Sequence, residues 1–285
     1  MNLYKYLPPS RIDVIRDCSI RFTQYGDFND PFELNPNINR IAEEDEIRSL
    51  VDRDFVQLIK DEYSKYPIIS AYISKEDFIQ LAESQREHVK NGVVGMERQL
   101  VGLLPEMLQM TTNSLLGALS LSEVCNHELM WSHYADEHRG YVIGFDAAHQ
   151  FFNQRKTDVD EMRHLRKIDY REKPPVINLM NTNGEELFFV KSLKWKYESE
   201  WRMLMPLADA SKIIERQPYP AHLFDFPIEA VTEVILGERM SAQDKEIINA
   251  LRNVKGYKHI NWYQAKLDNT SFEIVIKPVK LATTQ

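Results

Sequence analysis

The sequence has few cysteines, few glycines and no long apolar segment. Of its 285 residues, two are cysteine and ten are glycine. Two cysteines exclude a disulfide framework and a cysteine-rich metal module, and no glycine-rich phosphate-binding motif is present. No segment approaches the roughly 20 consecutive apolar residues of a membrane span, and the first residues lack the pattern of a secretory signal. We therefore expect a cytoplasmic protein with no membrane partner.

Acidic residues outnumber basic ones, 43 to 35, which gives a formal net charge of -8. A negative chain is disfavoured for broad, non-specific binding to nucleic acids, which needs a positive surface. A local basic cleft remains compatible with this charge. The hydrophobic share of 43% and the charged share of 27% are typical of a globular protein. The length favours a single domain that spans residues 1–285.

Strand-like and helix-like segments alternate irregularly along the chain. Short apolar segments predict strands, for example at residues 3–7, 116–121 and 231–236. Ser241, followed three positions later by Asp244, predicts the start of a helix. The connections are too short and irregular for repeated β-α-β units. We therefore predict an α+β fold with a mixed, mainly antiparallel sheet.

Residues 41–113 have a different pattern from the rest of the chain. Apolar residues recur there at helical spacing, as from Ile47 to Ile59, and strand-like segments are rare. The sequence Ser74-x-x-Asp77 is typical of a helix start. We interpret residues 41–113 as a helical insertion within the single domain.

The first polar motif, at residues 29–33, follows a predicted strand. It contains Asn29, Asp30 and Glu33 around a proline. One interpretation is purely structural, because Asn and Asp side chains bond their own backbone in turns and proline fixes φ. The other is that the motif belongs to a binding site, since such sites are often built on loops that follow strands.

The second polar motif, at residues 127–134, has the spacing of a short helix. Met130 and Trp131 fit one apolar face and are expected in the core. His133 and Tyr134 carry polar groups that can reach a cleft. The histidines lack the i, i+4 spacing of a helical zinc pair, so we expect no metal ligand here.

The third polar motif, at residues 191–202, begins with Lys191 and Lys194 and is rich in aromatic and charged side chains. In a strand, Glu198, Glu200 and Arg202 would project from one face. Adjacent carboxylates raise one another's pKa and an arginine lowers it, so the motif can hold one acid and one base. The alternative is a solvated face on which the arginine simply pairs with a glutamate.

Taken in order, these motifs resemble domain-of-unknown-function family 2971, a bacterial family. The resemblance rests on five blocks of this sequence: residues 3–6 (Leu-Tyr-Lys-Tyr), 29–33, 129–140, 195–202 and 233–237. It covers most of the chain outside the helical insertion. The family has no defined activity, so the resemblance implies none.

A second resemblance, of pattern alone, is to ADP-ribosyltransferase-like domains. It implies an ADP-ribosyltransferase-like sheet, with Tyr134 and either Glu198 or Glu200 as catalytic residues. Lys5 and Tyr6 lie on the first strand, where those domains carry His or Arg, and would bind substrate together with the residues Asn29, Asp30, Glu33, His133 and Arg202. In this interpretation NAD is a substrate and no cofactor is bound.

Three functions remain open from the sequence. The first is an NAD-dependent ADP-ribosyltransferase or NAD glycohydrolase that acts as a toxin or phage-defence effector; the sequence does not identify a protein or nucleic-acid acceptor. The second is a metal-dependent phosphodiesterase or nuclease, because carboxylates such as Asp30 and Glu33 can bind Mg²⁺. The third is a non-enzymatic interaction or sensing domain.

Overall fold

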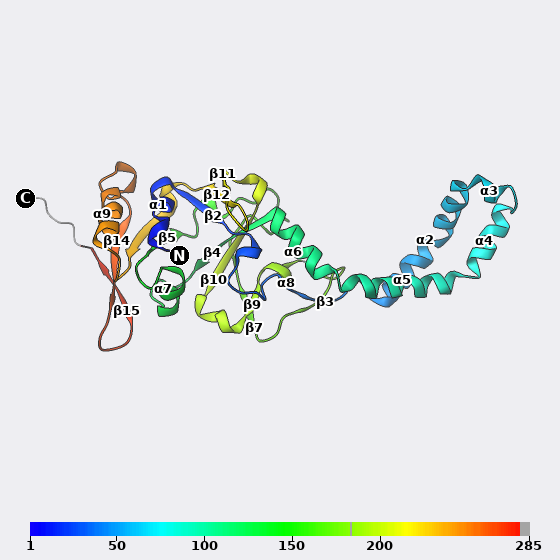
Figure 1. Cartoon of the computed structure of the whole chain (residues 1–285), viewed down its shortest axis with the longest axis horizontal. Coiled ribbons are helices and arrows are strands. Elements are labelled where there is room, and N and C mark those ends of the chain that lie inside the picture. Colours follow the sequence, from blue (N-terminus) through cyan, green and yellow to red (C-terminus); the bar gives the residue numbers. More distant parts are fainter. Residues whose placement is uncertain (183, 280–285) are drawn as a thin grey trace, which may run out of the picture. The chain divides into compact units, whose positions relative to one another are not determined.

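The structure, a computed structural model, describes residues 1–182 and 184–279. The chain forms two compact units (Figure 1). Unit 1 comprises Met1–Glu33, Thr111–Lys173 and Phe189–Gln285, and unit 2 comprises Leu34–Met110 and Pro174–Phe188. About 41% of the structure is helix and 27% is strand, and the sheet is mixed and mostly antiparallel. The predicted α+β class is therefore confirmed.

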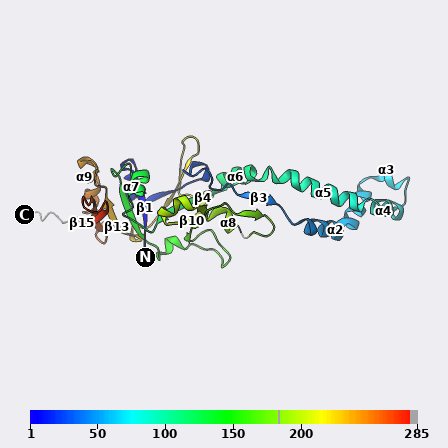
Figure 2. The same cartoon turned by 90° about the horizontal axis from the view of Figure 1, so that it is seen from below.

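An eight-stranded sheet forms the centre of unit 1 (Figures 1 and 2). Its strand order is β15-β14-β13-β5-β1-β4-β10-β6. Neighbouring strands are antiparallel, except that β13 and β14 are parallel. The strands are β1 (Asn2–Leu7), β4 (Leu116–Ser122), β5 (Tyr141–Asp146), β6 (Arg166–Lys167), β10 (Glu200–Pro206), β13 (Val231–Leu236), β14 (Asn261–Leu267) and β15 (Ile274–Pro278).

Helices and smaller sheets cover both faces of this sheet. On one face the larger core includes Leu3, Ile143 and Ile248, the last from α9 (Ala242–Leu251). On the other face Tyr6 packs against Trp131 of α7 (Glu128–Tyr134). The remaining elements of unit 1 are α1 (Asp13–Asp17), the antiparallel sheet of β2 (Ser19–Phe22), β11 (Lys212–Ile214) and β12 (Ala221–Asp225), and the parallel pair of β7 (Asp169–Arg171) and β9 (Val190–Ser192).

The central sheet opens between β1 and β4. β1 pairs with β5 along its whole length, from Asn2 to Leu7, but with β4 it forms a single pair, Tyr4 with Ser122. Further along β4, Ala118 bridges instead to Thr23, which directly follows β2. β1 and β4 therefore diverge, and side chains of both strands face the space between them.

Unit 2 is mainly helical. Helix α2 packs against α4 and α5, and the parallel strands β3 and β8 complete the unit. One buried cluster of this unit consists of Ala42, Ile47 and Val94, and Leu34, Ile38, Phe55 and Ile177 are buried as well. The elements are β3 (Asn37–Arg40), α2 (Glu44–Lys65), α3 (Pro67–Ser70), α4 (Lys75–Glu83), α5 (Arg86–Val101), β8 (Val176–Asn178), α8 (Glu185–Phe188) and α6 (Leu104–Leu115), which continues into unit 1.

In the described part of the chain, no helix combines the length and apolar character needed to cross a membrane.

Candidate functional site

A cavity of about 580 Å³ lies in unit 1 where β1 and β4 diverge. Its walls come from segments far apart in the sequence: β1, the loop after β2, β4, α7, β9 and the start of β10. All the residues selected from the sequence line it, namely Lys5, Tyr6, Asn29, Asp30, Glu33, His133, Tyr134, Glu198, Glu200 and Arg202. The three polar motifs therefore meet at one place.

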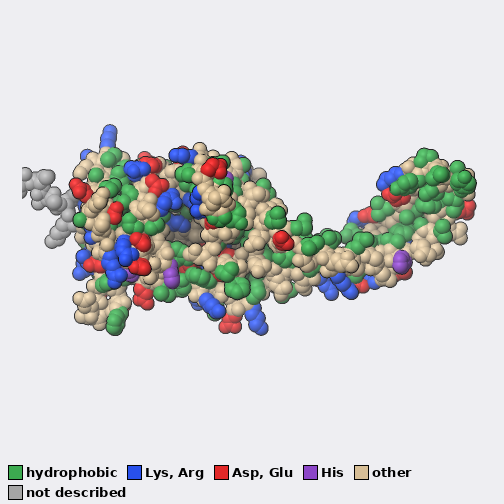
Figure 3. All heavy atoms as spheres, viewed as in Figure 1, with side chains coloured by type: hydrophobic (Ala, Val, Ile, Leu, Met, Phe, Trp, Pro, Cys, Tyr) green, Lys and Arg blue, Asp and Glu red, His purple; other side chains and the backbone are tan. Residues whose placement is uncertain are grey.

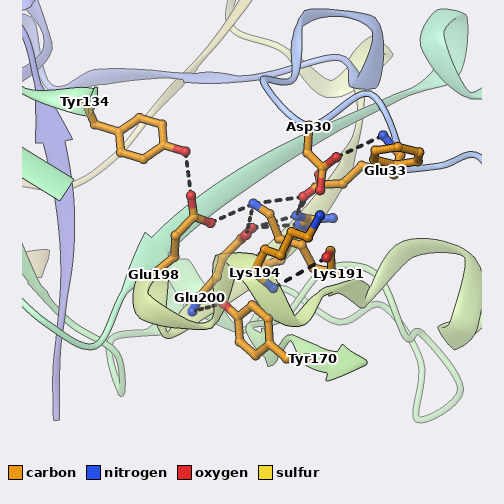
Figure 4. Close-up of polar contacts among 11 residues, drawn as sticks. Asp30, Glu33, Tyr134, Tyr170, Lys191, Lys194, Glu198 and Glu200 are labelled. Atoms are coloured by element: carbon orange, nitrogen blue, oxygen red, sulfur yellow. Dashed lines mark hydrogen bonds and ion pairs between the residues drawn. The ribbon is translucent and has the colours of Figure 1, made fainter. Parts of the chain in front are cut away.

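The ammonium group of Lys191, from β9, lies at the centre of this site (Figure 4). Its Nζ is 2.6 Å from Oε2 of Glu198, 3.1 Å from Oε2 of Glu200 and 2.9 Å from Oε1 of Glu33. Burial alone would lower the pKa of Lys191, but the three carboxylates outweigh it and raise that pKa above its ordinary value. Lys191 is therefore a permanent cation at the point the three acids share.

Arg202 connects two of the same carboxylates from the other side. Its Nε donates to Glu200 over 2.9 Å, and its Nη2 lies 3.1 Å from Oε2 of Glu33. The side chain is 1% exposed, and its guanidinium also lies 5.1 Å from the ring centre of Phe28. Burial would lower the pKa of Arg202, but Glu200 and Glu33 raise it well above its ordinary value. The guanidinium of Arg202 therefore stays charged and bound to Glu33 and Glu200.

The two cations act differently on their acidic partners. Burial would raise the pKa of Glu200, but Arg202 and Lys191 lower it to about 2. For Glu33, burial dominates and raises the pKa, although Arg202 and Lys191 oppose it. Glu200 is therefore a firmly ionised member of the cluster, as a buried charge with two cationic partners should be.

The prediction of one continuous strand over residues 198–202 is wrong. Glu198 ends a 3-10 helix, Leu193–Glu198, and β10 begins only at Glu200. Between them Ser199 has the left-handed backbone conformation, with φ 45° and ψ 50°. This turn, and not the alternation of a strand, directs both glutamates toward Lys191.

Glu198 reaches furthest toward the α7 wall of the cavity. Its Oε1 accepts a 2.5 Å hydrogen bond from the hydroxyl of Tyr134, while its other oxygen bonds Lys191. Burial and the negative charge of Glu198 raise the pKa of Tyr134, so the phenol stays protonated. A side-chain hydrogen bond from Asn29 also reaches Tyr134. Ser122 fixes the backbone, because its hydroxyl donates to the carbonyl of Glu198 over 2.6 Å.

The cavity also has a cationic side. Lys5 of β1 extends across the gap in the sheet and donates to the backbone carbonyl of Ser120 over 3.0 Å. Burial lowers the pKa of Lys5 to about 8, with Glu200 opposing the shift and Arg11 adding to it. Arg11 and Arg21 also line the cavity, each beside an aspartate, Asp13 and Asp27 respectively.

Three other selected residues have mainly structural contacts. Asp30 accepts from the backbone N–H of Phe32 over 2.9 Å, as expected of an Asx turn, and its other oxygen is buried without a partner among the described residues. Tyr6 donates its hydroxyl to the carbonyl of Val124 over 2.8 Å. His133 is exposed beside the ring of Tyr197 at the cavity rim.

The carboxylates do not form a metal site of the usual kind. Within residues 1–182 and 184–279, no group of three or more His, Cys, Asp or Glu side chains is arranged to hold an ion. The acids that converge, Glu33, Glu198 and Glu200, converge on an ammonium group. Lys191 thus supplies the positive charge that a cation would otherwise bring.

Lys191 is the first residue of the third polar motif, but the sequence assigned it no role in the site, and it gave no role to Arg11 or Arg21 either. Lys191 stands seven positions before Glu198, a spacing that suggests contact in neither a helix nor a strand. Arg21 lies in an alternating strand, where a charged residue is normally solvated. Only the pairing of distant segments brings these cations to the cavity.

No curated protein and no solved structure shows significant similarity to this chain. The model of one family does match: residues 130–203 resemble the family described as "Protein of unknown function (DUF2971)". The matched segment runs from α7 to β10 and so contains Tyr134, Lys191, Glu198, Glu200 and Arg202. The similarity to this family thus lies in the part of the chain that builds the acidic half of the cavity.

Proposed function

We propose that the cavity binds NAD and that the protein breaks the bond between nicotinamide and ribose. ADP-ribose then passes to water or to an acceptor. The observation that carries this proposal is the position of Glu198, which is held by Tyr134 and Lys191 at one side of a cavity whose other side carries Lys5, Arg11 and Arg21. A ligand with a sugar and a diphosphate matches this division into an acidic and a basic side.

The chemistry assigns a role to each side. When the bond from ribose C1′ to the nicotinamide nitrogen breaks, its electron pair stays on that nitrogen and positive charge develops on the ribose. A fixed carboxylate beside C1′ lowers the energy of this charge, and Glu198 would have that role. A hydroxyl oxygen of water or an acceptor then bonds C1′ and loses its proton. Tyr134 would orient Glu198 and pack against the nicotinamide ring.

Lys5, Arg11 and Arg21 would bind the diphosphate. Charge-assisted hydrogen bonds to phosphate are among the stronger polar interactions. Arg202 is a poorer candidate for this role than the sequence suggested, because Glu33 and Glu200 already engage its guanidinium. Glu200 is in turn a poorer candidate than Glu198 for contact with the ribose, because two cations, Lys191 and Arg202, bind its oxygens, whereas Glu198 is bound by one cation and by the neutral phenol of Tyr134.

The rival proposal of a metal-dependent phosphodiesterase has less support. It needs a hard cation among the carboxylates, and the Lys191 ammonium lies within 3.1 Å of Glu33, Glu198 and Glu200. The third proposal, a non-enzymatic domain, gains no support from the fold or from the family match. A buried ionic cluster beside an open cavity is typical of functional sites and favours an enzyme.

The proposal extends to a biological role. We propose that the protein acts in the cytoplasm of a bacterium, as a toxin or phage-defence effector that consumes NAD. Expression of the native chain should then lower the cellular NAD pool and arrest growth, and expression of Glu198→Gln should do neither.

The direct test is release of nicotinamide from NAD by the purified protein, followed by chromatography. Glu198→Gln keeps the shape of the side chain and removes its charge, so we expect a loss of roughly 100-fold or more in rate. Glu215→Gln is the matched control, because Glu215 is exposed and lies outside the cavity.

Chelation separates the two enzymatic proposals. Nicotinamide release should persist in EDTA, and cleavage of phosphodiesters by the native protein should be undetectable with Mg²⁺. If NAD stays intact with every acceptor fraction tested while a phosphodiester is cleaved only with Mg²⁺, the NAD proposal is wrong.

A further inference from the structure

The surface of unit 2 carries a continuous apolar stripe that the proposed reaction does not use. It consists of the exposed side chains Val89, Val93, Met96, Leu100, Leu103, Met107 and Met110. Figure 3 shows hydrophobic side chains at the surface of these helices. Exposure is high even for the largest members, at 65% for Met96 and 67% for Met110. Such a patch on a soluble chain marks an interaction surface.

The spacing of the stripe alternates between four and three residues over its whole length. This is the 3.5-residue period of a coiled-coil seam, sustained over three heptads. A neighbouring face of the same helix, with Lys90, Val94 and Glu97, is buried within unit 2. Packing within unit 2 therefore accounts for these buried residues, but it does not account for the apolar residues at the heptad positions of the stripe.

The helix that carries the stripe is nearly continuous. Helix α5 ends at Val101 and α6 begins at Leu104. Across the junction Leu103 bonds back to the carbonyl of Leu100, and Met107 to that of Leu103. The seam therefore continues from α5 to α6 across one short turn at Gly102 and Leu103.

A glycine beside the stripe, Gly92, points to close approach of another helix. A side chain placed there would meet no atom of the chain within 4 Å. Nothing in the described structure requires glycine at this position, yet it costs about 1 kcal/mol relative to alanine within a helix. Small residues next to a seam let two helix backbones come close.

We infer that this stripe, from Val89 to Met110, is the interface on which a second copy of the chain binds to form a homodimer. The partner must present an apolar seam of matching length and period, and the chain itself carries one. Seven half-exposed side chains of this size offer on the order of 500 Å² per copy, so two copies bury on the order of 1,000 Å², the lower end of specific interfaces.

The charge pattern favours a copy of the chain over an anionic membrane. Along one edge of the seam the exposed positions Gly92 and Gln99 are uncharged and only Glu106 carries a charge, so repulsion between two copies along this edge is limited to that position. Membrane-surface helices are rich in Lys and Arg beside their apolar face. Here Arg98 is accompanied by Glu87 and Glu106, which gives no basic face.

The test is the mass of the full chain by sedimentation equilibrium under reducing conditions. At micromolar concentrations we expect a dimer. The double variant Leu100→Glu with Leu103→Glu, at the centre of the stripe, should raise the dissociation constant at least tenfold. The matched control is Leu58→Glu with Leu81→Glu, two equally exposed leucines of unit 2 outside the stripe, and it should remain a dimer. Circular dichroism must show the same helix content in all three proteins.

Oxidation by peroxide provides a second measurement. Met96, Met107 and Met110 should be oxidised more slowly in the native protein than in the variant with Leu100→Glu and Leu103→Glu. A native protein that stays monomeric overturns the inference. If its three methionines are nevertheless protected, the stripe is covered by the chain itself. A dimer that survives both glutamate substitutions in the stripe also overturns it.

Discussion

At the scale of single residues, the central feature is a buried group of charges that nearly balance. Lys191 and Arg202 face Glu33, Glu198 and Glu200, and Lys5 lies close enough to influence the last two electrostatically. A buried charge is tolerated only when it is paired. Removal of one partner should therefore affect stability as well as any chemistry.

Replacement of Glu200 by Gln should destabilise the fold. The change leaves Arg202 and Lys191 short of one buried negative charge, which costs about 3 kcal/mol in free energy of unfolding. Because the folded pKa of Glu200, about 2, lies below its ordinary 4.5, its stabilising contribution is present above pH 4.5 and is lost as pH falls toward 2. Urea denaturation of both proteins should show the difference narrowing over that range.

The control for this experiment is Glu215→Gln, an exposed substitution that should change stability by no more than about 0.5 kcal/mol. If Glu200→Gln unfolds at the same urea concentration as the native protein at neutral pH, the cluster does not support the fold in the way its geometry indicates.

Lys5 should make ligand binding sensitive to pH. Its pKa of about 8 means that the ammonium is present below that pH and is lost above it. If Lys5 binds the diphosphate, affinity for ADP-ribose should be constant below pH 8 and fall about tenfold above it, the effect of one charge-assisted hydrogen bond. Calorimetry across this range measures it. Lys5→Met should bind weakly and show no step, and a step that persists in Lys5→Met would assign the titration to another group.

At the scale of elements, the turn at Ser199 decides where Glu198 points. A side chain in the left-handed region is strained, and strain is greatest for a β-branched residue. Ser199→Val should therefore lower the free energy of unfolding by about 1–2 kcal/mol and reduce nicotinamide release, because Glu198 shifts relative to Lys191. Ser199→Gly fits the same conformation and should retain both properties. Thermal unfolding and the activity assay distinguish these outcomes, and equal effects of Val and Gly would refute the argument.

Elements with strong local signals were predictable. The strand Val231–Leu236 and the capped start of α9 at Ser241 agree with the sequence pattern. Strand β12 was not predicted, because Ala221–Asp225 is short, contains a histidine and lies between prolines. Its strand conformation depends on pairing with β2 and β11, which local sequence does not encode.

The site was predictable in its acidic and aromatic residues but not in its centre. Glu198, Glu200 and Arg202 could be selected from the sequence because three charged residues that alternate with aromatic and polar ones are unusual in a strand. Lys191 gains its role only when β9 lies beside the loop that carries Glu33, a contact between residues 158 positions apart. The gap between β1 and β4, which forms the cavity, likewise arises from strand register. The amino-acid composition of the two strands does not predict it.

At the scale of the whole molecule, the two units differ in how much apolar surface supports them. The core of unit 1 includes a large set of buried residues on both faces of an eight-stranded sheet. The described buried hydrophobic side chains of unit 2 form a smaller set: Leu34, Ile38, Ala42, Ile47, Phe55, Val94 and Ile177. Because local stability follows buried apolar contacts, the two units should open at different free energies.

Hydrogen exchange followed by mass spectrometry should resolve this difference. Amides of β5, in the middle of the sheet, should exchange only on global unfolding, and those of α2 should exchange through opening of unit 2 alone. Dimerisation through the stripe adds a further expectation: amides of α5 should be protected more strongly at high protein concentration, while those of β5 should not change. The variant with Leu100→Glu and Leu103→Glu should lose the concentration dependence. Equal exchange of α2 and β5 would mean that the two units unfold as one, despite the small core of the helical unit.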